Sequence, residues 1–212
     1  MLGILCGLES EARIARRIVG ARVACAAARP QKGRDLVREL VMQGATRLMS
    51  LGIAGALGPS IKLGDVFIGT RVVSETGAWD CDDAWGGLLA ARISGVQRGG
   101  VYGSEKLVAT AQEKAALYAQ HGCAIVDMES QCVAEVAAEQ GIPFTVIRAV
   151  CDDATMNVPP LVMAAVGEDG GIRVGAALAS IAANPAQFID LFRMARGTHR
   201  ALAALRKTPK SI

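Results

Sequence analysis

The sequence has 212 residues, of which 51% are hydrophobic and 20% are charged, a composition that excludes a disordered chain and suits one domain with a substantial core. The net charge of +3 is too small to indicate a nucleic-acid-binding protein, and no apolar stretch approaches the length of a membrane span. Residues 1–6 lack the pattern of a signal peptide and the six cysteines lack zinc spacings, so we expect a cytoplasmic protein without a metal or cofactor.

Short apolar segments alternate with helical patterns along the chain. In chain order we expect strand 1–6, helix 9–19, strand 22–28, helix 33–44 and strand 46–52. There follow a long strand or strand pair at 64–74, a strand that ends at 101–103, helix 105–122 closed by Gly122, strand 123–127, helix 129–141, strand 143–150 and a mostly helical region at 161–206.

This alternation predicts an α/β fold with three layers, α/β/α, around a central mixed and largely parallel sheet. No linker divides the chain, so we expect a single domain over residues 1–212. The stretch 75–98 has weaker periodicity and contains both tryptophans, and we interpret it as an excursion over an active site.

Carboxylates follow three of the predicted strands, and the carboxyl ends of strands are where such sheets bind ligands. Each pair also has a structural interpretation as a helix cap or as an acid in a first helical turn. Three such pairs together predict a convergent acidic pocket. The pairs are Glu9 and Glu11, Asp127 and Glu129, and Asp152 and Asp153.

A glycine-rich turn also follows a predicted strand, in the segment GIAGALGPSIKLGD (52–65). Gly52 and Gly55 allow the backbone to approach a ligand closely, but the segment lacks the GxGxxG pattern of a dinucleotide site. The two histidines, His121 and His199, lie in polar contexts, which tells against a serine-hydrolase triad. Arg148 lies within a predicted buried strand and needs a carboxylate partner, so we interpret it first as structural.

Four ordered segments, GLESEAR (7–13), GIAGALGPSIKLGDV (52–66), VDMES (126–130) and VIRAVCDDA (146–154), resemble one family. It is the nucleoside phosphorylase and nucleosidase superfamily, which includes methylthioadenosine/S-adenosylhomocysteine nucleosidases and purine nucleoside phosphorylases. The resemblance runs from residue 1 to about 155. It implies a purine nucleoside substrate, with adenine as the expected base, and a homo-oligomer.

The resemblance also implies roles for individual residues. Glu129 would hold the ribose hydroxyls with Met128 packed on the sugar, and Asp152 would protonate N7 of the purine. Glu11 would activate water, with Glu9 as the alternative. Further substrate contacts are expected from Gly52, Ile53, Ala54, Gly55, Lys106, Leu107 and Tyr102.

The sequence departs from the phosphorylase pattern at the glycine turn. Where phosphorylases place a Ser and an Arg to hold phosphate, this chain has Ser50 and Ile53, which favours water as the nucleophile. Phosphorolysis, with phosphate as co-substrate, is the alternative, and a non-catalytic nucleoside-binding protein is the third interpretation. Lys106 replaces an aromatic residue, so base stacking would come from Trp79, Trp85 or Tyr102.

The C-terminal segment NPAQFIDLFRMARGTHRALAAL (184–205) resembles the hopanoid-associated branch of the family, whose proposed substrate is adenosylhopane. A cluster of basic residues accompanies it. The cluster is interpreted either as a solvated helix face or as a surface that contacts an anionic membrane. Its members are Arg193, Arg196, Arg200, Arg206, Lys207 and Lys210.

Overall fold

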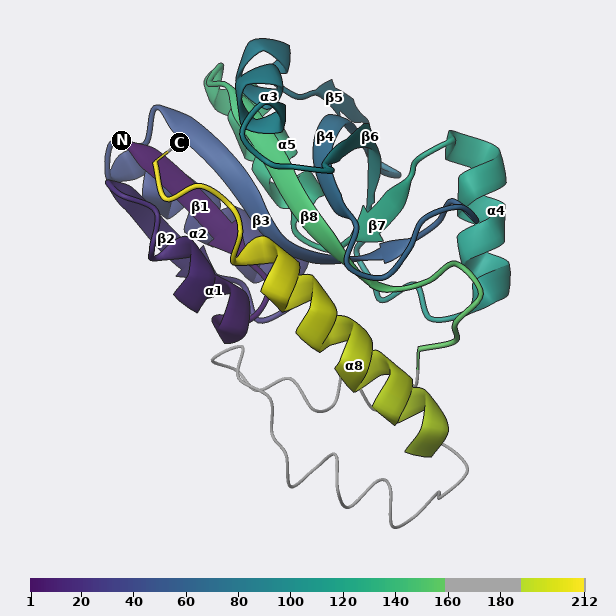
Figure 1. Cartoon of the computed structure of the whole chain (residues 1–212). Helices are drawn as coiled ribbons and strands as arrows, with labels where there is room; N and C mark the ends of the chain where they lie inside the picture. Colours follow the sequence, from purple (N-terminus) through teal and green to yellow (C-terminus); the bar gives the residue numbers. More distant parts are fainter. Residues whose placement is uncertain (159–187, 212) are drawn as a thin grey trace.

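The computed structural model describes residues 1–158 and 188–211 (Figure 1). Its strands are β1 (Leu2–Cys6), β2 (Ala21–Cys25), β3 (Arg47–Ala56), β4 (Val66–Val73), β5 (Ala78–Asp80), β6 (Gln97–Gly103), β7 (Ile125–Asp127) and β8 (Phe144–Asp152). Its helices are α1 (Glu9–Ala15), α2 (Pro30–Met42), α3 (Asp83–Ala90), α4 (Ala111–His121), α5 (Ser130–Gln140) and α8 (Phe188–Leu205).

The strands form one mixed sheet, as predicted. The pairs β1–β2, β1–β3, β3–β8, β4–β6 and β6–β7 are parallel, whereas β3–β7, β4–β5 and β4–β8 are antiparallel. Strand β8 pairs with both β3 and β4, so β3, β8, β4, β6 and β7 close into a ring. The predicted sheet did not include this closure, which depends on β3 being long enough to pair with β1, β8 and β7.

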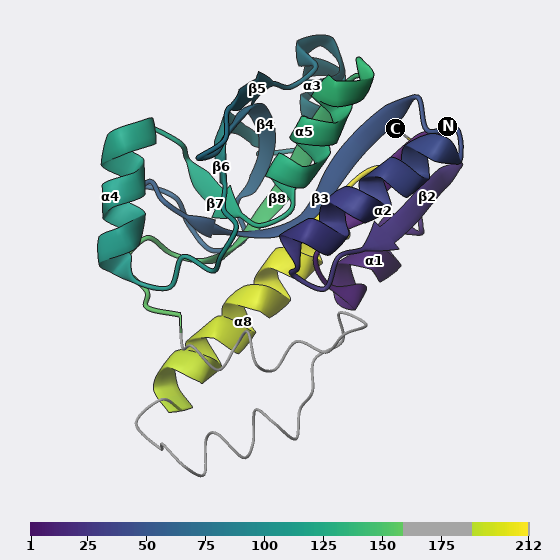
Figure 2. The same cartoon turned by 180° about the vertical axis from the view of Figure 1, so that it is seen from behind.

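Alternate residues of the central strands pack into two cores on opposite faces of the sheet. On β1, Leu5 packs with α2 and α5, while its neighbours Ile4 and Cys6 pack with α1, α3 and α8. Figure 1 shows α1 and α8 on one face, and Figure 2 shows α2 and α5 on the other. The predicted three-layer α/β arrangement is confirmed.

Two helices begin at different residues from those predicted. Helix α2 starts at Pro30 rather than residue 33. Proline fits the first helical position, because a backbone N–H there would have no acceptor within the helix. Helix α4 starts at Ala111 rather than residue 105, because Thr110 and Glu113 form a reciprocal capping box. Residues 104–110 are therefore a loop. The predicted closure of α4 at Gly122 is confirmed, with a left-handed φ of 65°.

Residues 75–98 lie at the edge of the sheet. Strand β5 pairs with β4, and α3 buries Trp85 and Leu89 in the core that it shares with α1 and α8. The Arg47 guanidinium lies 3.9 Å from the centre of the Trp85 ring. The Trp85 ring is therefore buried against other side chains of the protein, and the expectation that it stacks on a base is wrong.

The predicted C-terminal helical region is confirmed in part. Helix α8 spans Phe188–Leu205, whereas residues 161–187 lie outside the described residues. In the part of the chain that the structure describes, no helix is long and apolar enough to cross a membrane.

Candidate active site

Glu11 is buried beside the glycine turn. Its Oε2 accepts hydrogen bonds from the N–H groups of Gly7 and Leu8, both at 2.8 Å, and its Oε1 accepts one from Ile53 N–H at 2.8 Å. Each carboxylate oxygen has two acceptor positions, so Oε1 retains one for a further donor such as water. Burial raises the pKa of Glu11, while Arg148 and the three N–H donors act in the opposite direction.

Glu9, the alternative water-activating residue, lies on the surface of the same helix. Its carboxylate is 2.6 Å from Arg16 Nη1 and 3.5 Å from Arg13 Nε. The hydrogen bond from Arg16 lowers the pKa of Glu9, although its slight burial opposes this. Of the two glutamates, the fold brings only Glu11 to the strand ends.

Arg148, on β8, lies fully buried at the centre of the acidic residues. Its Nε is 2.7 Å from Asp127 Oδ2, and its Nη2 is 3.5 Å from Glu129 Oε2. The guanidinium also donates to the hydroxyl of Ser50 and, at 3.4 Å, to the Ile53 carbonyl. The sequence prediction that Arg148 needs a carboxylate partner is confirmed, and the guanidinium is already engaged by two carboxylates.

Asp127 lies two residues before Glu129, the N-cap residue of helix α5, and its carboxylate accepts hydrogen bonds at the start of this helix. Its Oδ1 accepts the N–H groups of Glu129 at 2.9 Å and Ser130 at 2.7 Å, and its Oδ2 accepts the Ser130 hydroxyl. The capping role expected for Asp127 is confirmed, but the same carboxylate also pairs with Arg148. Asp127 thus joins the helix start to the buried arginine.

Glu129 is 6% exposed, which confirms that its carboxylate faces inward. Burial raises its pKa to about 8, with further increases from Asp127 and Glu11 and an opposing effect of Arg148. Burial also opposes the charge of Arg148, but the three surrounding carboxylates outweigh it and raise the pKa of the guanidinium. One guanidinium faces three carboxyl groups, so this cluster carries a net negative charge when all are ionised.

Asp152 ends β8 and is 5% exposed. Its Oδ2 accepts a hydrogen bond from the ammonium of Lys114, a fully buried residue of α4, and Cys151 Sγ lies 3.1 Å from its Oδ1. The sequence predicts an acidic pocket at this strand end, but the partner of Asp152 in the structure is a cation. Nothing in the sequence pattern of α4 distinguishes Lys114 from a solvated lysine, so sequence reasoning missed it.

Three glycines provide the space that these side chains occupy. A Cβ at Gly7 would lie 2.6 Å from Glu129 Oε1, and one at Gly52 would lie 2.3 Å from Arg148 Nη1. A Cβ at Gly55 would lie 2.9 Å from Asp152 Oδ2. On β3, Gly52 and Gly55 are about 10 Å apart, so the spaces occupied by Arg148 and by Asp152 lie along the same strand.

The remaining predicted substrate contacts lie around this core. Lys106 is exposed and Leu107 is half-buried in the loop 104–110, where Ser104 Oγ donates to the Lys106 carbonyl at 2.7 Å. Tyr102 is buried, and its ring stacks on His121 with 4.9 Å between centroids. One face of Tyr102 is therefore already covered, while the binding roles of these residues stay predictions.

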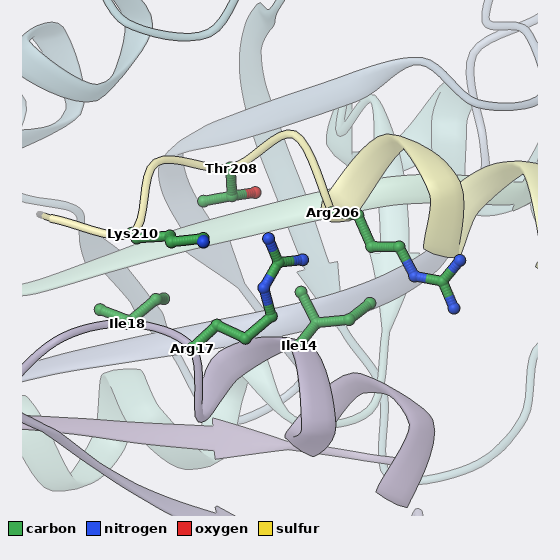
Figure 3. Close-up of a pocket in the computed structure, with 6 residues that line it drawn as sticks. All are labelled: Ile14, Arg17, Ile18, Arg206, Thr208 and Lys210. Atoms are coloured by element: carbon green, nitrogen blue, oxygen red, sulfur yellow. The ribbon is translucent and has the colours of Figure 1, made fainter.

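A small hollow between α1 and the C-terminal segment is the clearest cavity near the basic cluster (Figure 3). Its volume of about 10 Å³ is enough for roughly one water molecule. Its charged groups are all cationic, and it contains none of the predicted site residues, so we do not place the active site there. It is lined by Ile14, Arg17, Ile18, Arg206, Thr208 and Lys210.

Among residues 1–158 and 188–211, no group of three or more His, Cys, Asp or Glu side chains is arranged to hold a metal ion.

A mixed sheet with acidic side chains gathered at its strand ends is the architecture of an α/β enzyme that binds a small polar ligand. A sequence profile described as "Phosphorylase superfamily" matches residues 33–183. The chain belongs to this superfamily, and it is an enzyme of the nucleosidase and nucleoside phosphorylase class. A search of curated protein sequences gave no match.

Solved structures share the fold at low sequence identity. A 5'-methylthioadenosine/S-adenosylhomocysteine nucleosidase from Neisseria meningitidis, in complex with methylthio-immucillin-A, has 16% identity and a TM-score of 0.72, with 98% of this chain and 95% of that chain covered. Futalosine hydrolase of Helicobacter pylori has 15% identity and a TM-score of 0.70 over 98% and 96% of the two chains. S-adenosylhomocysteine nucleosidase from Streptococcus pyogenes has 17% identity and a TM-score of 0.69 over 98% and 94%. These similarities establish the fold alone.

Proposed function

We propose that this enzyme hydrolyses the N-glycosidic bond of a purine nucleoside, with adenine as the expected base. The structural neighbours named for nucleosidase and hydrolase activity support this reaction. Glu129 and Met128 hold the ribose, Glu11 activates water and Asp152 serves the leaving base. The 5′ carbon carries a substituent, and adenosylhopane is the specific substrate that the C-terminal segment suggests.

The observation that favours hydrolysis over phosphorolysis is that the Arg148 guanidinium already pairs with two carboxylates. The guanidinium lies beside Gly52, and its partners are Asp127 and Glu129. Binding phosphate requires several donors that are free to face the anion. A guanidinium shared among neighbouring carboxyl groups offers a phosphate dianion little uncompensated positive charge, whereas a neutral water molecule needs none.

The proposed chemistry breaks the bond between C1′ and N9. The bonding electrons move into the purine, whose N7 receives a proton delivered through Asp152, and C1′ becomes oxocarbenium-like. Glu11 accepts a proton from water as the water oxygen bonds to C1′. Glu129, close to the sugar, stabilises the developing positive charge in its ionised form, which its raised pKa of about 8 places toward alkaline pH. The products are the free base and the 5′-substituted ribose.

Measuring product formation with and without phosphate separates the two reactions. Hydrolysis predicts equal rates of adenine release in phosphate-free buffer and in phosphate, with free ribose as the sugar product. Strict dependence on phosphate, with a ribose 1-phosphate product, would establish the alternative of phosphorolysis. Tight nucleoside binding without release of a base would instead support the third interpretation, a non-catalytic binding protein.

Replacing Asp152 with Asn tests the acid assignment. General acid–base catalysis typically contributes ~10²–10⁴-fold, so kcat of Asp152→Asn should fall by at least ~10²-fold. Asp153→Asn is the matched control, because the Asp153 carboxylate accepts only local bonds from Thr155, at 2.9 and 2.7 Å. Near-wild-type turnover of Asp152→Asn would show that Asp152 is not the acid.

The 5′ substituent is the finer part of the proposal. A panel of methylthioadenosine, adenosine, futalosine and a long-chain 5′-alkyl adenosine would rank substrates by kcat/KM. A hopanoid substrate predicts the highest value for the long-chain compound. Equal values for all four would leave the enzyme a general nucleosidase and would contradict the hopanoid assignment.

We also expect contact with an anionic membrane surface and assembly as a homo-oligomer. The basic residues at the C-terminal end are exposed, and Phe192, on α8, is 62% exposed beside them. Binding to vesicles with anionic lipid, but not to neutral vesicles, would support the first expectation, and loss of binding in Arg206→Glu/Lys207→Glu/Lys210→Glu would assign it to this cluster. Light scattering in solution measures the second.

A further inference from the structure

Lys114 is the one residue of α4 that is buried, and it is a lysine. Its exposed fraction is 0%, although it belongs to a helix that lies at the periphery of the molecule (Figure 1). An ammonium group is costly to remove from water unless partners satisfy it, and apolar residues commonly replace such pairs without loss of stability. A lysine at this position therefore calls for a role beyond packing.

The ammonium uses all three of its N–H donors on one short segment of chain. It donates to Asp152 Oδ2, to the Asp153 carbonyl at 2.8 Å and to the Met156 carbonyl at 3.0 Å. Because an ammonium has only three donors, none remains for a ligand. Lys114 thus acts on the chemistry only through Asp152 and the turn that follows it.

Two further contacts tie the same turn to the start of α4. Ala111 N–H donates to Asn157 Oδ1 at 2.9 Å, and Val158 N–H donates to the Ala109 carbonyl at 2.7 Å. The capping box at Thr110 fixes the first turn of the helix between these contacts. Helix α4 and residues 152–158 therefore form one connected unit, with Lys114 as its buried centre.

We propose that Lys114 is a positioning residue that fixes the Asp152 carboxylate in the orientation that meets the purine base. This inference rests on the proposed hydrolysis of a purine nucleoside. The ammonium holds Oδ2. The other oxygen, Oδ1, accepts a hydrogen bond from Cys151 Sγ at 3.1 Å and keeps one acceptor position for the base.

The test compares Lys114→Met and Lys114→Gln with Gln112→Met, an exposed position on the same helix that receives the same new side chain. At its optimal pH, Lys114→Met should lose kcat by on the order of 10²-fold, as expected for a misplaced catalytic group, with KM nearly unchanged. Lys114→Gln keeps N–H donors that can still hold Asp152 Oδ2, so it should recover part of kcat.

The same substitutions in an Asp152→Asn background decide whether Lys114 works through Asp152. Lys114→Met should then lower kcat by no more than about twofold, because the group it positions is already changed. An additive loss would make Lys114 merely structural and refute this inference alone. Absence of hydrolysis by the wild-type enzyme, or full activity of Asp152→Asn, would refute the proposed function and this inference with it.

Discussion

Replacing Glu129 with Gln is expected to stabilise the folded protein at alkaline pH while it impairs the enzyme. The carboxyl is 6% exposed, and burial raises its pKa from 4.5 to about 8 despite the guanidinium of Arg148 nearby. A pKa above that of the unfolded chain means that the folded state binds the proton more tightly. This contribution to stability is complete below about pH 4.5 and is lost as pH rises through about 8.

The size of the effect follows from the same two pKa values. Each pKa unit corresponds to about 1.4 kcal/mol, so full ionisation of Glu129 costs up to about 5 kcal/mol of unfolding free energy. Movement of Arg148 toward the ionised carboxylate offsets part of this cost, and we expect about 2–5 kcal/mol. Glutamine has nearly the same shape and does not ionise, so Glu129→Gln avoids the loss.

Urea denaturation at pH 5, 7 and 9 measures this difference directly. The wild-type protein should lose unfolding free energy from pH 5 to pH 9, and the variant should lose much less and be the more stable of the two at pH 9. A weaker dependence of the unfolding free energy on pH should remain in the variant, because burial also raises the pKa of Glu11. Glu9→Gln is the control, since hydrogen bonding to Arg16 lowers the pKa of Glu9 and its removal should bring no gain.

Two results would refute the reasoning. An unchanged pH slope in Glu129→Gln would mean that Glu129 does not hold a proton in the folded state. A variant less stable than wild type at pH 9 would mean that the ionised carboxylate contributes more through Arg148 than burial costs it. In either case the interpretation of Glu129 as a residue kept for substrate rather than for stability would be wrong.

Two further substitutions examine the same cluster. Arg148→Met removes the guanidinium from three buried carboxyl groups and should cost about 3–5 kcal/mol at neutral pH, with recovery toward pH 5, as measured by urea denaturation; a loss that is equal at both pH values would contradict the electrostatic cause. Gly52→Ala places a Cβ 2.3 Å from Arg148 Nη1 and 2.8 Å from the Glu11 carboxylate, and should cost about 1–3 kcal/mol and lower kcat. Gly87→Ala, where a Cβ meets nothing within 4 Å, is its control, and similar thermal stability for the two variants would show that Gly52 is not crowded.

The position of the carboxylates could be predicted from the sequence because it follows from local patterns. An acid directly after a buried strand must lie at the end of that strand, and parallel strands bring their carboxyl ends to one edge. Glu11 follows β1 and Asp152 ends β8, as expected, and both strands run parallel to β3. Glu129 follows β7, which runs antiparallel to β3, so its place beside Arg148 depends on the closure of the sheet that the sequence did not predict. The choice of Glu11 over Glu9 needed the structure, since only the path of α1 shows which of the two faces Ile53.

The partners of these carboxylates could not be predicted, because they come from distant parts of the chain. Lys114 reaches Asp152 from a helix 38 residues earlier, and Arg148 on β8 reaches Asp127 on β7, a strand with which β8 does not pair. Hydrophobic periodicity indicates which side chains are buried, but it does not pair a buried cation with one carboxylate among several. The start of α4 is different, because the Thr110 and Glu113 capping box is visible in the sequence and marks the first residue of the helix better than the periodicity does.

In the proposed reaction, the ion-paired cations Arg148 and Lys114 act at opposite ends of the bound nucleoside. Arg148 is surrounded by carboxylates, so the sugar end is acidic and stabilises a developing oxocarbenium ion, whereas Lys114 gives the base end a cation that controls one carboxylate. Phosphorolysis on this scaffold would first require Arg148 to be released from Asp127 and Glu129. Asp127 would keep its bonds to the start of α5 through Oδ1, which accepts the Glu129 and Ser130 N–H groups, but its Oδ2 would lose the guanidinium. In the proposed reaction, a switch from water to phosphate would therefore leave a buried carboxylate without its cation and would need changes around Asp127 as well as in the site.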